Sequence, residues 1–478
     1  MTDKVTIRQL ATGVPGMDEM LGGGIPEFSF NLIAGVPGSG KTTLAHQMMF
    51  SLASPSCKAL FFTVVGEPPL KMLRYQQQFP FFNIDQVNTT IRYVNLADDL
   101  QSGNFDQVLR RIEEEVRDFS PRLVFVDSFR SVMQANQANG GTSRTLQHFI
   151  QQLGLKMTSW QATTFLIGEY ASPEAELSPI FTLADGILWI SQQVHGDSVV
   201  RKIQVVKMRG QAQKLGLHTF RIGSQGIEIF PRLILDSKPA RVTGEQRMSL
   251  GVPALDHMMG GGLPVAYAML LVGPSGSGKS VLATEFLEAG AKLGHKGVIA
   301  AFEKSPNQLL SHKLNRMIKE EQVGIIDTRA LDLSIDEILH DLMSMIKRMD
   351  AKRVVIDSLS GFELALAPVF RENFREALYR LVAVLTGMGV TVVMTAELED
   401  RYTDLRFSSY GNAFLADAIV MQRYVELSGQ LRKVISVVKI RGSIHSKELH
   451  FYDIAQGVFR IDESTAAYKN ILSGQIGV

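Results

Sequence analysis

The sequence is poor in several features that mark specialised classes of protein. Cys57 is the only cysteine among 478 residues, so neither an internal disulfide nor a cysteine-rich zinc site can form. Acidic and basic side chains nearly balance, at 48 and 49, which excludes a global field that would attract nucleic acid or anionic lipid. No run approaches the roughly 20 apolar residues that span a bilayer, and residues 1–10 are too polar for a secretory signal. We therefore expect a soluble cytoplasmic protein without a membrane partner.

What the sequence does contain is a long internal repeat. Residues 12–26 (TGVPGMDEMLGGGIP) match residues 250–264 (LGVPALDHMMGGGLP). Three shorter landmarks follow in the same order in both halves: a hydrophobic run ending in Asp-Ser, a Leu-Ala-Asp triplet and a Lys-x-Arg-Gly tetrapeptide. We predict two tandem domains, residues 1–238 and 239–478, with the junction in a polar, proline-containing stretch.

Each half alternates short apolar runs with helical periodicity. Residues 30–34 and 269–272 are typical of buried parallel strands. Apolar positions three or four residues apart, within 108–119 and 338–349, are typical of amphipathic helices. The alternation predicts an α/β fold in which each half is a mainly parallel sheet covered by helices.

Both halves carry the P-loop pattern G-x-x-x-x-G-K-[ST] after the first predicted strand, at residues 35–42 and 273–280. In such a loop, glycines let successive backbone N–H groups turn toward phosphate oxygens, and the following helix adds its positive end. The lysine would contact the β- and γ-phosphates, and the next hydroxyl would bind Mg²⁺. We therefore predict two sites for ATP and Mg²⁺. The predicted nucleotide-binding residues are Gly35, Gly38, Ser39, Gly40, Lys41, Thr42 and Thr43, and in the second half Gly273, Gly276, Ser277, Gly278, Lys279, Ser280 and Val281.

Asp127 and Asp357 each end a hydrophobic strand beside the predicted loop, where a carboxylate that supports a metal ion is needed. Serine follows each aspartate, so a helix N-cap or turn is the alternative interpretation. Because both halves repeat the arrangement, we favour the metal role. The predicted metal-binding residues are Thr42, Asp127, Ser280 and Asp357.

Taken together, the glycine-rich landmark, the P-loop, the strand ending in Asp-Ser and the Lys-x-Arg-Gly tetrapeptide resemble the two halves of the KaiC family over nearly the whole chain. The resemblance implies RecA-like domains, an ATPase with a signalling or timing role, and a hexamer or stacked rings with nucleotides between neighbouring subunits. A regulatory protein would be a further partner. The resemblance also implies that the Lys-x-Arg-Gly cations reach the neighbour's phosphates. Lys and Arg two apart on a strand point the same way, which suits such a clamp. A solvated strand face is the alternative interpretation, and the repetition in both halves favours the clamp. The predicted clamp residues are Lys207, Arg209, Lys439, Arg441 and His445, with Gln213 near the place of His445 in the first half.

The chain departs from the family pattern where two adjacent glutamates are expected after the second strand. The first half keeps Glu67 and the second keeps Glu303, which Lys304 follows. One well-placed carboxylate suffices for a catalytic base, so we predict both glutamates to be catalytic, together with Lys41 and Lys279. A surface or helix-capping role is the alternative interpretation of either glutamate. A nearby lysine would make Glu303 less basic, so the two sites should differ.

A second departure concerns self-phosphorylation, the alternative activity of a serine/threonine autokinase. Counting back from Asp417, the family's Ser-Thr pair is replaced by Ala413 and Phe414, neither of which has a hydroxyl. Two further alternatives stay open. A DNA-acting recombinase or helicase shares the core, although this chain has no basic run. A scaffold held together by ATP would retain nucleotide without releasing phosphate.

Overall fold

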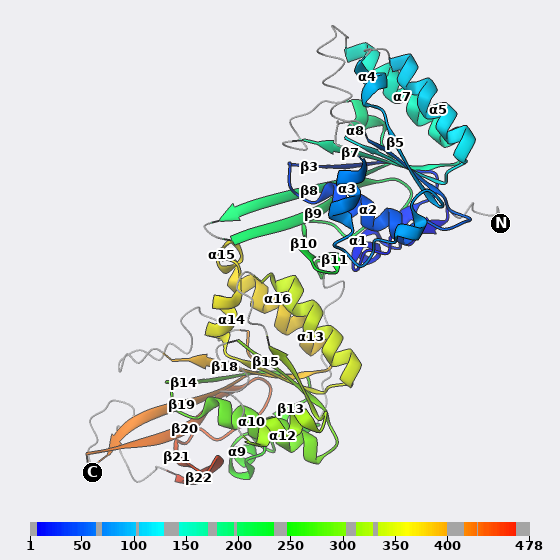
Figure 1. Ribbon diagram of the computed structural model, residues 1–478. Helices are drawn as coiled ribbons and strands as arrows, with labels where there is room; N and C mark the ends of the chain where they lie inside the picture. The colour runs from blue at the N-terminus through cyan, green and yellow to red at the C-terminus, as the bar shows by residue number, and fades with distance from the viewer. Residues whose placement is uncertain are drawn as a thin grey trace, which may run out of the picture. The chain divides into compact units, whose positions relative to one another are not determined.

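In the computed structural model the chain divides after Leu233 into two compact units, each described by itself (Figure 1). The structure describes residues 7–63, 69–101, 105–128, 143–170, 179–195, 198–233, 246–302, 312–327, 333–398, 415–427 and 429–464. The predicted boundary between residues 238 and 239 lies outside these ranges. No helix within them is long and apolar enough to cross a membrane.

The first unit is organised around a nine-stranded sheet in the order β11-β10-β9-β8-β3-β7-β6-β4-β5. The strands from β8 to β5 are parallel, and β9, β10 and β11 extend the sheet in antiparallel fashion. The strands of this sheet are β3 (Phe30–Gly35), β4 (Ala59–Thr63), β5 (Ile91–Asn95), β6 (Leu123–Asp127), β7 (Thr163–Glu169), β8 (Gly186–His195), β9 (Ser198–Met208), β10 (His218–Gly223) and β11 (Gly226–Phe230). A small separate sheet pairs β1 (Gln9–Leu10) with β2 (Ile25–Pro26).

Helices cover both faces of this sheet, as a parallel sheet requires. One buried apolar cluster joins the sheet to α2, and another joins its opposite face to α5 and α7. The repeating apolar positions Val108, Ile112 and Val116 of α5 are buried, as their spacing predicts. The helices are α1 (Met17–Leu21), α2 (Lys41–Leu52), α3 (Pro69–Gln76), the short 3₁₀ helix η1 (Ile84–Gln86), α4 (Ala97–Gln101), α5 (Phe105–Phe119), α7 (Ser143–Ser159) and α8 (Pro179–Leu183).

The second unit repeats this architecture strand for strand, with the order β22-β21-β20-β19-β14-β18-β17-β15-β16. Its strands are β12 (Arg247–Met248), β13 (Leu263–Pro264), β14 (Ala268–Gly273), β15 (Gly297–Ala301), β16 (Val323–Asp327), β17 (Arg353–Asp357), β18 (Thr391–Glu397), β19 (Ala418–Leu427), β20 (Gln430–Ile440), β21 (His450–Ala455) and β22 (Val458–Ser464). Its helices are α9 (Pro253–Met258), α10 (Lys279–Lys292), α12 (His312–Lys319), α13 (Ile335–Met349), α14 (Leu359–Ala365), α15 (Pro368–Arg371) and α16 (Phe374–Gly387). The predicted α/β class, with a mainly parallel, helix-covered sheet in each half, is confirmed.

Candidate nucleotide-binding sites

In each unit the P-loop connects the central parallel strand to the next helix, β3 to α2 and β14 to α10. Gly40 and Gly278 cap these helices with a φ of 104°, a left-handed conformation that glycine adopts without steric cost. A Cβ at either position would overlap an isoleucine Cδ1, that of Ile222 in β10 or Ile454 in β21. Each P-loop is therefore held between its own helix and the antiparallel hairpin at the end of the unit.

The P-loop lysines are buried and fold back under their loops. Lys41 Nζ donates to Val36 O at 2.8 Å, and Lys279 Nζ donates to Gly273 O at 2.8 Å. Burial lowers the pKa of Lys41, while the carboxylates of Glu169 and Asp127 oppose this shift. A buried ammonium beside glycine-rich backbone at a helix start has the chemistry of a phosphate site.

The two predicted metal sites differ in the partner of the aspartate. Thr42 Oγ1 donates to Asp127 Oδ2 at 2.7 Å, so the structure brings the two predicted ligands of the first unit together. In the second unit Asp357 Oδ1 accepts instead from Thr395 Oγ1 at 2.5 Å, while Ser280 is exposed. The hydroxyl of Thr395 has no equivalent in the first unit, because the fifth residue of β7 is Ile167.

The donor atoms at these positions fit Mg²⁺, which prefers oxygen ligands and usually combines one or two carboxylates with phosphate oxygens. Among the described residues, no group of three or more histidine, cysteine or acidic side chains could hold a metal alone.

Two acidic residues beside the P-loops escaped the sequence analysis. Glu169 ends β7 directly opposite Gly35, and Glu397 ends β18 directly opposite Gly273. Both close a seven-residue strand that begins with threonine. This repetition is a signal that an alignment of the two halves could have found.

The aspartate of each Leu-Ala-Asp triplet holds the arginine of the clamp. Arg209 Nη1 contacts Asp185 Oδ1 at 3.0 Å, and Arg441 Nη1 contacts Asp417 Oδ1 at 3.3 Å. The second carboxylate oxygen of each aspartate accepts from the backbone N–H that starts the central strand, at 3.0 Å in the first unit and 3.2 Å in the second. The arginine position is thereby fixed to the beginning of β3 or β14.

The clamp lysines are half-buried beside these arginines. Lys207 Nζ donates to Thr182 O at 3.0 Å, at the end of α8. Burial lowers the pKa of Lys207 and of Lys439; the neighbouring arginine lowers it further, and the triplet aspartate opposes the shift. His445 is half-buried, with Nδ1 2.8 Å from Ser446 O, and Gln213 is also half-buried.

The clamp residues do not lie near the P-loop of their own unit. Asn31 in β3 pairs with Gly186, so Asp185 and Arg209 lie beside the start of β3, whereas the P-loop leaves from its end at Gly35. Five residues of strand separate the two ends by roughly 16 Å. The second unit repeats this arrangement, because Asp417 N donates to Ala268 O at the start of β14. The predicted bases Glu67 and Glu303 lie outside the described residues, as do Ala413 and Phe414.

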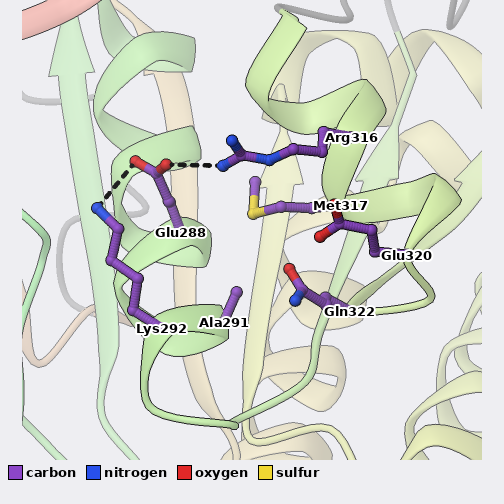
Figure 2. Close-up of a pocket in the computed structure, with 7 residues that line it drawn as sticks. All are labelled: Glu288, Ala291, Lys292, Arg316, Met317, Glu320 and Gln322. Carbon is purple, nitrogen blue, oxygen red and sulfur yellow. Dashed lines mark hydrogen bonds and ion pairs between the residues drawn. The ribbon is translucent and has the colours of Figure 1, made fainter.

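A cavity of about 310 Å³ in the second unit is distinct from the P-loop. It lies between α10 and α12, two to three turns beyond Lys279, and Figure 2 shows Glu288 paired with Lys292 and Arg316 at its wall. These ion pairs measure 3.5 and 3.2 Å. Glu288 thus pairs with both basic side chains of the cavity wall.

Comparison with known proteins matches both halves to one family. The family model described as "ATPase: KaiC" matches residues 10–234 and again residues 248–466. A circadian clock oscillator protein KaiC from Picosynechococcus sp. is 27% identical over 486 aligned residues, covering 98% of this chain and 92% of the relative. The protein of the same name from Rippkaea orientalis is 27% identical, with 98% and 91% covered. Circadian clock oscillator protein KaiC 1 from Synechocystis sp. is 26% identical, with 98% and 92% covered.

Proposed function

This chain belongs to the KaiC family of ATPases, and on that premise we propose that it hydrolyses ATP to ADP and phosphate at the interfaces between subunits of a homomeric ring. Both units carry a P-loop, so each subunit contributes two nucleotide sites. The curated relatives are named as circadian clock oscillator proteins. We extend this to the present chain as a signalling or timing role for the ATPase.

The residues of each site divide between two subunits in this proposal. Within one subunit, the P-loop backbone and Lys41 or Lys279 bind the triphosphate. Thr42 with Asp127, or Ser280 with Asp357, would hold Mg²⁺, which when bound offsets the charge of the phosphates. Lys207 and Arg209 of the partner subunit, or their counterparts Lys439 and Arg441 with His445, stabilise negative charge that develops on the γ-phosphate. Glu67 and Glu303 are the proposed bases for the attacking water.

The observation that carries the proposal is the position of the clamp. Lys and Arg stand at the end of the sheet opposite to the P-loop in both units, too far to contact a phosphate bound in the P-loop of their own unit. Because the aspartate holds each arginine at the start of the central strand, away from the P-loop of its own unit, this position supports action of the cations on a site that another subunit presents. A ring supplies that geometry, since every subunit then offers its P-loop to one neighbour and its clamp to the other.

Self-phosphorylation of the family's type is not part of this proposal. Ala413 and Phe414 stand where the Ser-Thr pair is expected, and neither side chain can accept a phosphate. A mass increase of one phosphate after incubation with ATP would nevertheless establish an autokinase.

The proposal is tested by ATP turnover and native mass with Mg²⁺, for the wild-type chain, Lys41→Ala, Lys279→Ala and the double variant. We expect each single variant to lose turnover at one site, the double variant to lose essentially all turnover, and the wild-type chain with ATP to show the native mass of a ring. Lys352→Ala is the matched control, because Lys352 lies on the surface beside Asp350. Tight nucleotide retention without phosphate release would instead indicate a scaffold, and salt-dependent DNA binding would indicate a DNA-acting ATPase.

The division between subunits is tested by mixing two inactive proteins. In a Lys41→Ala background, one subunit carries Lys279→Ala and the other carries Arg441→Ala. Mixed rings contain interfaces with an intact P-loop and an intact clamp, so we expect turnover above that of either parent. If the Arg441→Ala protein alone turned over ATP as fast as the Lys41→Ala protein, the proposed role of the clamp would be wrong.

A further inference from the structure

The segment that follows the Lys-x-Arg-Gly tetrapeptide is named here the clamp loop (residues 211–214 and 443–446). In each unit it contacts the glycine-rich landmark, residues 12–26 or 250–264. Lys214 N donates to Met20 O at 3.0 Å, and in the second unit Ser446 N donates to Met258 O at 2.7 Å. These are equivalent positions of the repeat. The landmark thus binds the clamp loop through its backbone in both units.

The first glycine of the Gly-Gly-Gly run lies where the two backbones approach most closely. A Cβ on Gly22 would overlap Ala212 O, and a Cβ on Gly260 would lie 2.8 Å from Ile444 O. Both glycines also have a left-handed φ, 79° and 73°, which other residues adopt at a cost. Close packing against the clamp loop therefore explains why this position is glycine in both halves.

Side chains add a second link, whose donor differs between the units. In the first unit Gln211 Nε2, from the clamp loop, donates to Leu21 O at 2.8 Å and to Gly24 O at 2.9 Å. In the second unit Arg247 Nη1, from β12, donates to the equivalent carbonyls of Met259 and Gly262 at 3.0 and 2.9 Å. Equivalent carbonyl oxygens therefore accept hydrogen bonds in both units, from the clamp loop in the first and from β12 in the second.

In each unit the donor to these carbonyls is itself bound by a further side chain, Gln9 in the first unit and Ser443 in the second. Gln9 Nε2 donates to Gln211 Oε1 at 2.7 Å. Arg247 Nη2 donates to the hydroxyl of Ser443, the counterpart of Gln211. A Gln–Gln pair in one unit is therefore replaced by an Arg–Ser pair in the other, and the connection from the small sheet through the landmark to the clamp loop is kept.

We propose that the glycine-rich landmark is the socket of the clamp loop, and that Gln9, Gln211, Arg247 and Ser443 are positioning residues for the cations offered to the neighbouring subunit. The clamp loop begins two residues after Arg209 or Arg441, while the triplet aspartate holds the arginine from the other side. Both ends of the short segment that carries the cations are thereby fixed. The inference rests on the proposed hydrolysis at subunit interfaces, and it assigns a role to a motif that the P-loop chemistry does not use.

The test is made in the second unit of the full-length protein, in a Lys41→Ala background that silences the first site. Arg247→Ala removes three hydrogen bonds and loosens the clamp loop, which keeps its backbone bond from Ser446 N to Met258 O. Because the displaced cations act in the transition state, we expect kcat to fall at least tenfold while KM for ATP changes less than threefold. The double variant Arg247→Gln, Ser443→Gln copies the pair of the first unit and should recover kcat to within about threefold of its parent.

Mixing distinguishes positioning of the clamp from a general loss of folding. Arg247→Ala subunits keep an intact P-loop, and Lys279→Ala subunits keep an intact clamp, so mixed rings should regain turnover. Damage to the P-loop of the Arg247→Ala subunit would leave the mixture inactive and overturn the inference. Arg348→Ala, an exposed position on α13, is the matched control and should turn over like its parent.

The outcomes separate this inference from the proposed function. A parent that turns over ATP and an Arg247→Ala variant with unchanged kcat overturn the positioning role alone. Absence of turnover both in this parent, Lys41→Ala, and in Lys279→Ala overturns the proposed hydrolysis and this inference with it.

Discussion

The helices that follow the two P-loops rest on chemically different supports. In the first unit His46 of α2 stacks against aromatic rings. Its ring centroid lies 4.6 Å from that of Phe61 and 6.1 Å from that of Tyr93. His46 is fully buried, and burial lowers its pKa to about 4. The imidazole is therefore neutral, with Nδ1 2.8 Å from the carbonyl of Thr42.

In the second unit the equivalent part of α10 faces charges. Glu285 and Glu288 replace Gln47 and Phe50, and both pair with Lys313 of α12, at 2.7 and 3.1 Å. Figure 2 shows Glu288 also held by Arg316 and Lys292. The ion pairs outweigh burial, which alone would raise the pKa of Glu288, and so its pKa is lowered.

A buried arginine completes the difference. Arg353 in β17 occupies the position of Leu123 in β6 and is fully buried. Its guanidinium stacks on Phe286 at 4.6 Å and donates to Ser249 O and Phe286 O at 2.8 and 2.7 Å. The glycine caps of both P-loops nevertheless share a φ of 104°. The backbone at the helix cap is thus alike above both sets of contacts. We expect the stability of the first unit to depend on the protonation of His46 and that of the second unit to depend on Arg353.

The largest expected effect comes from removing the buried arginine. Arg353→Ala leaves a cavity and two carbonyls without their donor, so we expect the second unit to lose about 4 kcal/mol of unfolding free energy. Arg353→Leu, which copies the first unit, also removes the donor but fills most of the buried volume, so it should cost less than Arg353→Ala. Hydrogen exchange in peptides from α10 and β17 measures both. Unchanged exchange in Arg353→Ala would show that the arginine does not support the helix.

The next effect is the pH dependence that His46 gives to the stability of the first unit. The pKa of His46 is about 4 in the folded chain and about 6.5 when unfolded, so the unfolded state binds the extra proton between these values. We expect the first unit to lose about 3 kcal/mol as pH falls from 6.5 to 4. His46→Thr, which copies Thr284, should remove this part of the slope in hydrogen exchange of α2. An identical slope in the variant would assign the acid sensitivity to other groups.

The smallest effect concerns the different partners of the two aspartates. Thr395→Val removes the hydroxyl that orients Asp357, and we expect the Mg²⁺ concentration for half-maximal turnover of the second site to rise about tenfold. The measurement uses the Lys41→Ala background. Ile167→Thr, in the Lys279→Ala background, supplies the same hydroxyl to the first unit as the matched change. Equal Mg²⁺ requirements for Thr395→Val and its parent would mean that Thr395 does not orient the metal ligand.

Much of the fold was predictable because its strands and helices carry local signals. The apolar run at residues 123–126 predicts a strand and forms β6. The helical spacing within residues 108–119 predicts a helix and forms part of α5. The P-loops were predictable because glycine and lysine stand at fixed offsets, and the KaiC resemblance is confirmed over both halves.

The remaining features of the sites depend on contacts between distant segments. The bond from Thr395 to Asp357 requires the register of two strands, and the link from Gln9 to Gln211 joins residues 202 positions apart. Neither leaves a periodic trace in the sequence. An alignment of the two halves shows which positions are equivalent. It does not show that a Gln–Gln pair and an Arg–Ser pair do the same work, because this depends on the carbonyl oxygens that both pairs bind in the structure.

The isoleucines that press on the P-loop glycines have a consequence for the order in which the chain becomes functional during synthesis. Gln47 of α2 exchanges two hydrogen bonds with the backbone of Ile227, at 2.6 and 3.0 Å, and Ile222 lies against Gly40. These contacts close a loop of about 180 residues. A ribosome must therefore release the last hairpin of the unit before its phosphate site, encoded near the start, takes its final shape, and nascent chains cut before β11 should bind ATP poorly.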